Sequence, residues 1–426
     1  MQTAKKSSEY SNRVSEIRRL RIQGHLAKAQ VLLDSFPQAD VVYLESDEAS
    51  QLRYEKGCLL LNQGDFNEAY RIFEELMRVD TLGKAKSTGL GLNGLGLCSF
   101  VNGYHQQALD FFHRALEFFE QMDCQKEVVK VLGNLSECLL ELGEVFQAKE
   151  LLQRAMQISE ENNNMYGIAW ARAGLGSILA VENRLEESRW AFVDAISRFD
   201  ELEIQKVWVL CEAAEVFTVS GELQFAENLL QRATKAAKYS SVGEMARVQL
   251  QWGILEFERG NLGLASHHYQ SALSRSNEVK MRARAYLQMA RVHLSKYRSE
   301  LRDYAIDEIE YYVDQALELA EKPTPIIPLM IEINFVKAGL AETQLDFDKA
   351  INILQEAKKH AIDIKIPTLS KKLNVQVEQV KQKRKNLMRF IQTAHSESTL
   401  RSQEITNNDA KSYLEEILRI VGHRSR

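Results

Sequence analysis

The residues of this 426-residue sequence that first suggest chemistry are three glycines and two adjacent histidines. Gly89, Gly91 and Gly94 have the G-x-G-x-x-G spacing that holds a dinucleotide pyrophosphate where a strand precedes it and a helix follows. No strand pattern precedes these glycines and they fall within a helical stretch, so close packing of helices explains them better. His267 and His268 would point about 100° apart on a helix and could not readily chelate one metal ion.

The other polar residues form no catalytic pattern either. No two of the nine histidines have the i, i+4 spacing of a helical metal site. The acidic pairs Glu186/Glu187 and Asp307/Glu308 are typical of solvated helix faces, and the sequence contains no Walker loop, nucleophile elbow or Cys–His signature. We therefore expect no catalytic residues, no metal site, no cofactor and no enzymatic activity.

The composition favours helices and a protein partner. Hydrophobic residues make up 45% of the chain, whereas glycine (21 residues) and proline (5 residues) are scarce. Charged residues make up 27%, with a net charge of −5, which argues against nucleic acid or an anionic membrane as the main partner.

The sequence also indicates a compartment. Residues 1–15 are polar and no run of about 18 apolar residues occurs, so we expect neither a secretory signal nor a membrane span. The five cysteines form no C-x-x-C pair, and several occupy apolar helical positions where a thiol acts as a small hydrophobe. These features predict reduced thiols and a cytoplasmic protein.

One spacing recurs along most of the chain: a turn residue, then alanine five positions later, an aromatic residue or leucine at nine, and alanine at twelve. Gly103, for example, is followed by Ala108, Phe112 and Ala115. The turn residues lie 38 to 40 positions apart and are Gly24, Gly64, Gly103, Gly143, Asn183, Gly221 and Gly260. Seven positions before most turns lies a small residue: Gly57, Gly96, Ser136, Gly176, Ala214 and Gly253.

This recurrence predicts pairs of antiparallel helices. The turn requires a residue that tolerates positive φ, hence glycine or asparagine, and the small residues let the two helices approach closely. One pair cannot bury its apolar face alone, so successive pairs must stack.

The pattern resembles the tetratricopeptide-repeat family over roughly residues 16–362. The resemblance implies an all-α, right-handed α-solenoid of about nine helix-turn-helix repeats with C-terminal capping helices. The family's usual period is about 34 residues, and units near 40 are similar to those of the Pins, rapsyn and kinesin light-chain group and of bacterial Rap and MalT regulators. HEAT and armadillo units have a similar length but lack this glycine-then-alanine spacing.

We expect five segments along the chain. They are a superhelix of repeats 1–8 (1–322), a proline-rich connector (323–328), a last repeat with a capping helix (329–394), a flexible linker (395–409) and a terminal amphipathic helix (410–426). The terminal helix could dock into the superhelix as a built-in competitor, dock on another subunit, or cap the stack.

In this family the first helices of the repeats line a concave groove. Counting six positions before, two before and one after each small residue gives the expected partner-facing residues: Lys130, Trp170, Trp208, Arg247, Arg284, Asn134, Glu212, Gln251, Gln288, Glu137, Glu215 and Arg291.

Three parts of this set have both a binding and a structural interpretation. Asn134 occupies a place where members with 40-residue units commonly carry an asparagine that hydrogen-bonds a bound peptide's backbone, or it is satisfied by a neighbouring helix. Trp170 and Trp208 are adjacent aromatic anchors or packing between repeats. The arginines of the set form a basic stretch suited to an acidic peptide, or a solvated face.

The function we expect is a non-catalytic scaffold or adaptor that holds a segment of a partner protein in the groove. The alternatives are a peptide- or effector-sensing regulator similar to Rap and MalT, and a structural subunit of a larger complex.

Overall fold

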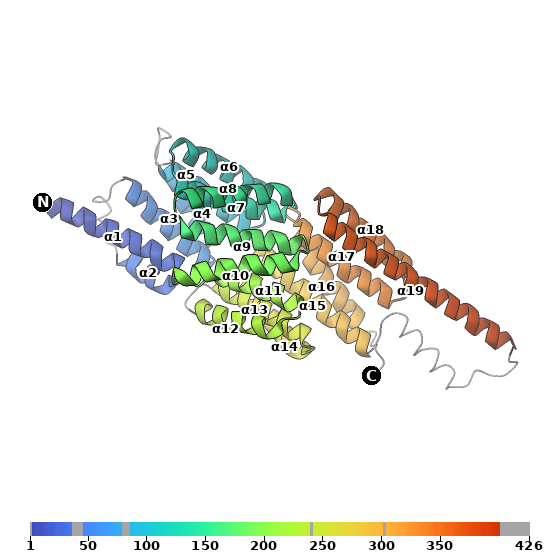
Figure 1. Ribbon diagram of the computed structural model, residues 1–426. Coiled ribbons are helices and arrows are strands. Elements are labelled where there is room, and N and C mark those ends of the chain that lie inside the picture. Colours follow the sequence, from blue (N-terminus) through green and yellow to red (C-terminus); the bar gives the residue numbers. More distant parts are fainter. Residues whose placement is uncertain (1, 36–45, 79–85, 239–241, 301–303, 401–426) are drawn as a thin grey trace. The chain divides into compact units, whose positions relative to one another are not determined.

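The repeat pattern folds as pairs of helices. The computed structural model describes residues 2–35, 46–78, 86–238, 242–300 and 304–400, and all regular structure in these ranges is helical (Figure 1). Eighteen helices form nine successive pairs and a nineteenth follows them. The fold is the expected all-α repeat solenoid.

The first seven pairs contain the recurring spacing. They are α1 (Gln2–Ile22) with α2 (Leu26–Asp34), α3 (Ser46–Gln63) with α4 (Phe66–Arg78), α5 (Lys86–Val101) with α6 (His105–Gln121), α7 (Gln125–Glu141) with α8 (Val145–Glu161), α9 (Met165–Val181) with α10 (Leu185–Glu201), α11 (Val207–Val219) with α12 (Leu223–Ala237), and α13 (Val242–Glu258) with α14 (Leu262–Arg275). The rest are α15 (Val279–Glu300) with α16 (Tyr304–Glu321), α17 (Ile327–Thr343) with α18 (Phe347–Asp363), and α19 (Pro367–Leu400).

The turn residue of every one of the first seven pairs is left-handed, as the spacing predicts. The six glycines have φ between 81° and 84°, and Asn183 has φ 58°. A second kind of left-handed turn joins consecutive pairs at Asp123, Asn163 and Glu203, with φ between 51° and 56°. The sequence pattern does not reveal these positions, because they lack glycine.

In four of the pairs, a glycine of the first helix faces an aromatic ring of the second helix. A Cβ atom added to Gly57 would lie 2.5 Å from the Phe73 ring, and one added to Gly253 would lie 2.3 Å from the Tyr269 ring. Both rings are fully buried. Burying one such ring contributes about 2–3 kcal/mol, so the close approach directly stabilises each pair.

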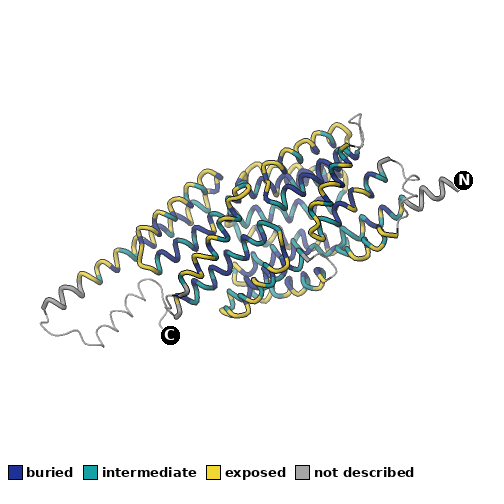
Figure 2. The backbone as a smooth tube through the Cα atoms, turned by 180° about the vertical axis from the view of Figure 1, so that it is seen from behind, coloured by how far each residue is buried: buried dark blue, intermediate teal, exposed yellow. Residues whose placement is uncertain are grey.

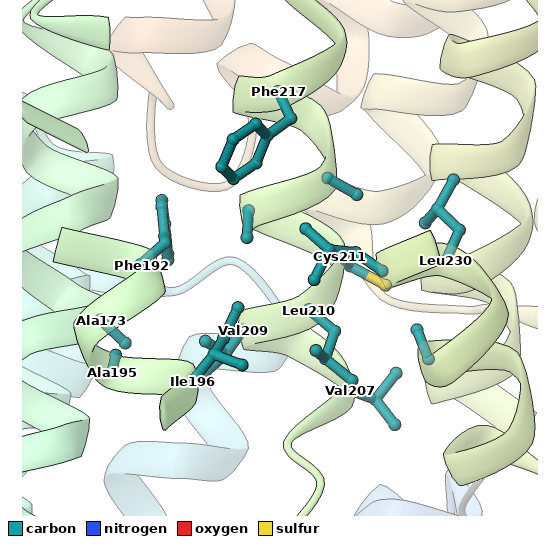
Figure 3. Packing of buried hydrophobic residues seen from close by; sticks show 14 of the residues in the cluster. Ala173, Phe192, Ala195, Ile196, Val207, Val209, Leu210, Cys211, Phe217 and Leu230 are labelled. Atoms are coloured by element: carbon teal, nitrogen blue, oxygen red, sulfur yellow. The ribbon is translucent and has the colours of Figure 1, made fainter. Parts of the chain in front are cut away.

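These contacts repeat into a continuous core. Buried and exposed residues alternate along the helices, so each helix turns one face to its neighbours (Figure 2). In the cluster drawn in Figure 3, Phe192 of α10, Cys211 of α11 and Leu230 of α12 belong to one group of buried side chains. Ile22, at the end of α1, packs against the same cluster. The first repeat therefore contacts the middle of the stack.

The chain divides into two compact units. The first comprises residues 1–285 and 319–328, and the second comprises residues 286–318 and 329–426. Within the second unit, Lys383 pairs with Glu342 at 2.7 Å, and Arg298 donates to the Gly339 carbonyl at 3.0 Å. These contacts join α19 and α15 to α17.

The structure agrees with some of the expected segments and differs from others. Gly89, Gly91 and Gly94 lie on α5 with no strand before them among the described residues, as expected for helix packing. Pro328 belongs to the first turn of α17, where a missing N–H costs no hydrogen bond. Residues 395–400 of the expected linker continue α19, because they contain no glycine or proline to stop it. The rest of the linker and the helix 410–426 lie outside the described residues.

Within the described residues, no helix is long and apolar enough to cross a membrane. Nor do histidine, cysteine and acidic side chains gather there in a group of three or more that could hold a metal ion. The five cysteines are free thiols, four of them buried.

Candidate partner-binding face

The first helices of the first unit share a surface on which side chains from distant repeats meet. Lys206, before α11, donates to the Ile22 carbonyl of α1 at 2.7 Å, and Lys280 of α15 pairs with Glu141 of α7. Helices α3 and α13 also contact each other. We call this surface of α1, α3, α5, α7, α9, α11, α13 and the start of α15 the inner face.

A polar stripe on α7 lies at the centre of the inner face. Its residues are spaced three and four apart, which places them along one side of a helix: Glu127, Lys130, Asn134, Glu137 and Glu141. Glu127 pairs with Lys86 of α5 at 3.0 Å, and Asn134 donates from Nδ2 to Oδ1 of Asn93 at 2.9 Å. With Glu141 bound to Lys280, every second residue of the stripe has a partner.

Lys130 and Glu137 are the two residues of the stripe that have neither a hydrogen bond nor an ion pair with any described residue. Burial and, after it, the positive charge of Arg18 lower the pKa of Lys130 to about 8, while Glu127 opposes the shift. Desolvation raises the pKa of Glu137 to about 7, with Lys280 opposing and Glu212 reinforcing the shift. The folded chain thus holds two ionisable groups whose charged forms it stabilises poorly, a property of ligand sites.

One edge of the Asn134 amide is satisfied by a neighbouring helix. Its amide N–H₂ is used by Asn93, which in turn donates to the Tyr54 hydroxyl at 2.7 Å. Its Oδ1 makes no hydrogen bond to a described residue, and the side chain is half-buried. One amide edge therefore fixes the side chain to α5, and the other edge can accept a hydrogen bond from a ligand.

Trp170 and Trp208 lie beside this asparagine and contact each other. Their ring centroids are 5.2 Å apart with an interplanar angle of 63°, and both side chains are half-buried. Gly133 leaves room for the first ring, since a Cβ atom there would lie 2.7 Å from Trp170 Nε1. The Nε1 group of Trp208 is buried without an acceptor among the described residues. The pair packs between repeats and still carries an unsatisfied donor.

The basic stretch expected from the arginines is neutralised. Arg247 pairs with Glu278 at 3.8 Å, and Arg284 pairs with Glu215, which also accepts from Gln251 Nε2 at 2.7 Å. The sequence-based set included Glu215 but could not show that it pairs with Arg284, because the two residues lie on different helices far apart in the sequence.

Four more residues of the expected set are placed differently. Gln251 and Gln288 are each 2% exposed, so neither presents a free amide to a partner. Gln288 and Arg291 belong to the second unit, where Arg291 donates to Gln288 Oε1 at 3.0 Å. Glu212 accepts a hydrogen bond from Ser177 of the neighbouring helix.

Several residues of the inner face were not predicted. Tyr54, Asn93 and the Arg21–Glu55 pair come from α1, α3 and α5. Glu55 lies two positions before Gly57, so the register that selected Asn134 could have selected it. Tyr166 stacks toward Trp170 at 6.1 Å and would require knowledge of the local packing.

Replacing Glu137 with glutamine should flatten the pH dependence of stability. The folded-state pKa of about 7 lies above the usual 4.5, so the folded chain binds more protons between these values and the wild type loses stability as the pH rises through them. An amide cannot ionise, so the Glu137→Gln variant should be more stable than the wild type at pH 8. The pKa shift alone would give a larger difference in the free energy of unfolding, but the side chain is exposed to solvent, so we expect about 1 kcal/mol. At pH 4.5 the two should be equal.

Thermal unfolding followed by circular dichroism from pH 4.5 to 8 measures this difference. Glu150→Gln on α8, an exposed residue without an ion pair to a described residue, is the matched control and should follow the wild type. A constant difference between Glu137→Gln and the wild type across the pH range would contradict the assignment.

Comparison with known proteins agrees with this architecture. Residues 50–81 match the model of the tetratricopeptide repeat. The fold is similar to a Rap protein complexed with competence and sporulation factor, at 15% identity and a TM-score of 0.50 over 79% of this chain and 100% of that one. It is also similar to NprR in complex with its cognate peptide NprX, at 14% identity and a TM-score of 0.53 over 74% of this chain and 89% of that one.

No curated protein matches the chain in sequence. The repeat match, the left-handed turns at a period near 40 residues and the shared fold together show that this chain has a tetratricopeptide-like repeat fold.

Proposed function

We propose that this chain is a non-catalytic scaffold that binds a segment of a partner protein against the inner face of the first unit. The observation that carries the proposal is the α7 stripe, where two ionisable side chains without partners flank Asn134, whose Oδ1 is also unbonded among the described residues. Lys130 and Asn134 are half-buried and Glu137 is exposed, so water solvates them in the free chain and a ligand with complementary polar groups can replace that water.

The arrangement fits a peptide segment in chemical terms. Asn134 Oδ1 can accept a backbone N–H without reading the sequence of the segment. Trp170 lies against Gly133, next to Asn134, and packs on Trp208, so the two half-buried rings offer apolar surface to the segment. Lys130 and Glu137 stand one turn to either side of Asn134 and can attract unlike charges.

Affinity capture from native lysate tests this proposal through Asn134→Ala and Trp208→Ala. Loss of a central tryptophan typically costs about 2 kcal/mol, so captured partners should fall roughly thirtyfold with Trp208→Ala and about fivefold with Asn134→Ala. The matched controls are Trp190→Ala and Asn67→Ala, whose side chains are exposed on the second helices α10 and α4. Circular dichroism checks that each variant is folded.

Recovery of the same partners at equal yield with both inner-face variants would exclude the proposed surface. Trp208→Phe keeps a smaller aromatic ring at this position and removes the buried indole N–H. It therefore separates the loss of the whole side chain from the loss of part of its apolar surface. We expect an intermediate yield from it.

A second candidate function is a regulator in which a small peptide changes the winding of the stack. It is favoured by the ion pairs between first helices far apart in the chain, Lys280 with Glu141 and Arg284 with Glu215, since a ligand that displaces one of them would alter how the repeats meet. The crystallised NprR complex holds a cognate peptide. Both functions allow a short peptide to stabilise the chain. Small-angle X-ray scattering separates them, because peptide binding should change the dimensions of a regulator and leave those of a scaffold unchanged.

A further inference from the structure

Four cations gather where α1, α5 and α7 meet α3 on the inner face. They are Arg18 and Arg21 of α1, Lys86 of α5 and Lys130 of α7. Two carboxylates accompany them, Glu55 of α3 and Glu127 of α7. We call these six residues the basic cluster.

Both carboxylates of the basic cluster already have cationic partners. Arg21 binds Glu55, whose side chain is fully buried and accepts a second hydrogen bond from Gln51. Lys86 binds Glu127 at 3.0 Å. Both carboxylate oxygens of Glu55 and one of Glu127 are therefore engaged within the fold.

Arg18 and Lys130 remain without an ion pair or a hydrogen bond to any described residue. Four positive and two negative side chains leave an excess of two positive charges in this part of the inner face. The two cations act on the same groups: burial raises the pKa of Glu55, but Arg21, and then Arg18 and Lys130, lower it below its usual value. For Glu127 too, burial opposes the lowering caused by Lys130, Lys86 and Arg18.

We propose that Arg18 and Lys130 form a binding site for an oxyanion, either a carboxylate or a phosphate. A guanidinium group binds two oxygens of such an anion as a fork, and an ammonium group adds a point charge. A bound anion would neutralise the excess charge of the basic cluster. It would also separate two like charges that otherwise repel.

The site does not depend on the proposed function for its chemistry. It rests on that function only for the source of the anion, which we assign to an acidic side chain or C-terminal carboxylate of the bound segment. Lys130 belongs both to the α7 stripe and to the basic cluster, so a segment lying along the stripe reaches the site.

The first experiment uses inorganic phosphate as the probe. Thermal unfolding of the full chain is followed against phosphate concentration at pH 7, with sodium chloride holding the ionic strength constant. We expect saturable stabilisation of the wild type. Lys130→Met and Arg18→Met should each weaken the apparent affinity at least tenfold.

Matched controls come from the same region. Lys126→Met on α7 and Arg53→Met on α3 remove exposed cations that have no ion pair with a described residue, and both should keep the wild-type response. Lys130→Met without phosphate should melt above the wild type at pH 7, because it removes an unpaired, desolvated charge. A lower melting temperature would indicate a structural lysine and count against the proposal.

The pH dependence gives an independent readout. Lys130 loses its proton as the pH rises through about 8, so sulfate, an oxyanion whose charge is constant over this range, should stabilise the wild type less at pH 9.5 than at pH 7. Arg18→Met should retain this trend at reduced affinity, and Lys130→Met should lose it. Equal stabilisation of the wild type and both variants, or a response no larger than that to sodium chloride, would overturn the site.

A second arm distinguishes the two sources of the anion. The peptide Ala-Ala-Glu with a free C-terminus is compared with its Ala-Ala-Gln amide at equal concentration. Stabilisation by both phosphate and the acidic peptide, but not by the amide, supports a carboxylate of the bound segment, whereas stabilisation by phosphate alone assigns a phosphate and excludes the acidic segment. Unchanged partner capture by Asn134→Ala and Trp208→Ala would remove the proposed function, while the response to phosphate would still decide the oxyanion site.

Discussion

Replacing Gly91 with alanine is expected to destabilise the first unit by about 2–3 kcal/mol. A Cβ atom at this position would lie 2.7 Å from both the Met77 amide nitrogen and the Phe73 carbonyl oxygen of α4. These are backbone atoms, which cannot rotate away as the end of a side chain can, so α4 and α5 would have to separate. The higher helix propensity of alanine, worth about 1 kcal/mol, offsets only part of the loss.

Urea unfolding followed by circular dichroism measures the stability, and hydrogen exchange of peptides from α4 and α5 locates the change. The control is the same substitution at Gly263, in the first turn of α14, where an added Cβ atom meets nothing within 4 Å. There alanine should stabilise the chain by about 0.5–1 kcal/mol. Opposite signs for one substitution would show that backbone contact, and not helix propensity, decides the outcome. Equal effects at the two positions would contradict this account.

The repeat spacing illustrates how far the sequence predicts this fold. Repeats at a period near 40 residues predict the left-handed turns from Gly24 to Gly260 and the close approach of paired helices at the small residues, and the structure confirms both. Each of these features depends on residues fewer than 20 positions apart. Local spacing is therefore sufficient to predict them.

The candidate site was less accessible to prediction, because its polar partners are distant in sequence. Lys280 and Glu141 are separated by 139 positions, and Arg284 and Glu215 by 69. Which carboxylate meets which cation depends on how far the stack winds per repeat, and the repeat pattern does not specify that quantity. The register could place Arg284 on the inner face but could not show that its charge is neutralised there.

The first repeat shows a different limit. Gly24 begins the weakest copy of the spacing, and α1 is rich in charged residues, so nothing in the sequence directs attention to Arg18 or Arg21. Ile22 packs against the cluster drawn in Figure 3, and this contact brings α1 to the middle repeats. The basic cluster follows from that long-range contact.

The ion pair of Arg21 with Glu55 tests how strongly α1 is held. Arg21→Met should destabilise the first unit by about 2–4 kcal/mol at pH 7, because it leaves the fully buried Glu55 carboxylate without its main partner. The control is Arg19→Met on the same helix, which breaks a solvent-exposed pair with Glu16 and should leave the stability nearly unchanged. Thermal and urea unfolding from pH 4 to pH 7 measure both.

The pH series identifies the mechanism of that loss. In the wild type, burial raises the pKa of Glu55, but Arg21 lowers it below its usual value, so the pair stabilises the fold above pH 4.5 and loses this effect as the pH falls through the folded-state pKa. Without Arg21, burial dominates and the carboxyl can be protonated at a higher pH, which removes the buried charge. The gap between Arg21→Met and the wild type should therefore be largest at pH 7 and narrow toward pH 4. The double variant Arg21→Met/Glu55→Gln should recover much of the stability at pH 7, since it leaves no charge unpaired. A gap that stays constant with pH, or a double variant as unstable as the single one, would mean that Arg21 acts through packing alone.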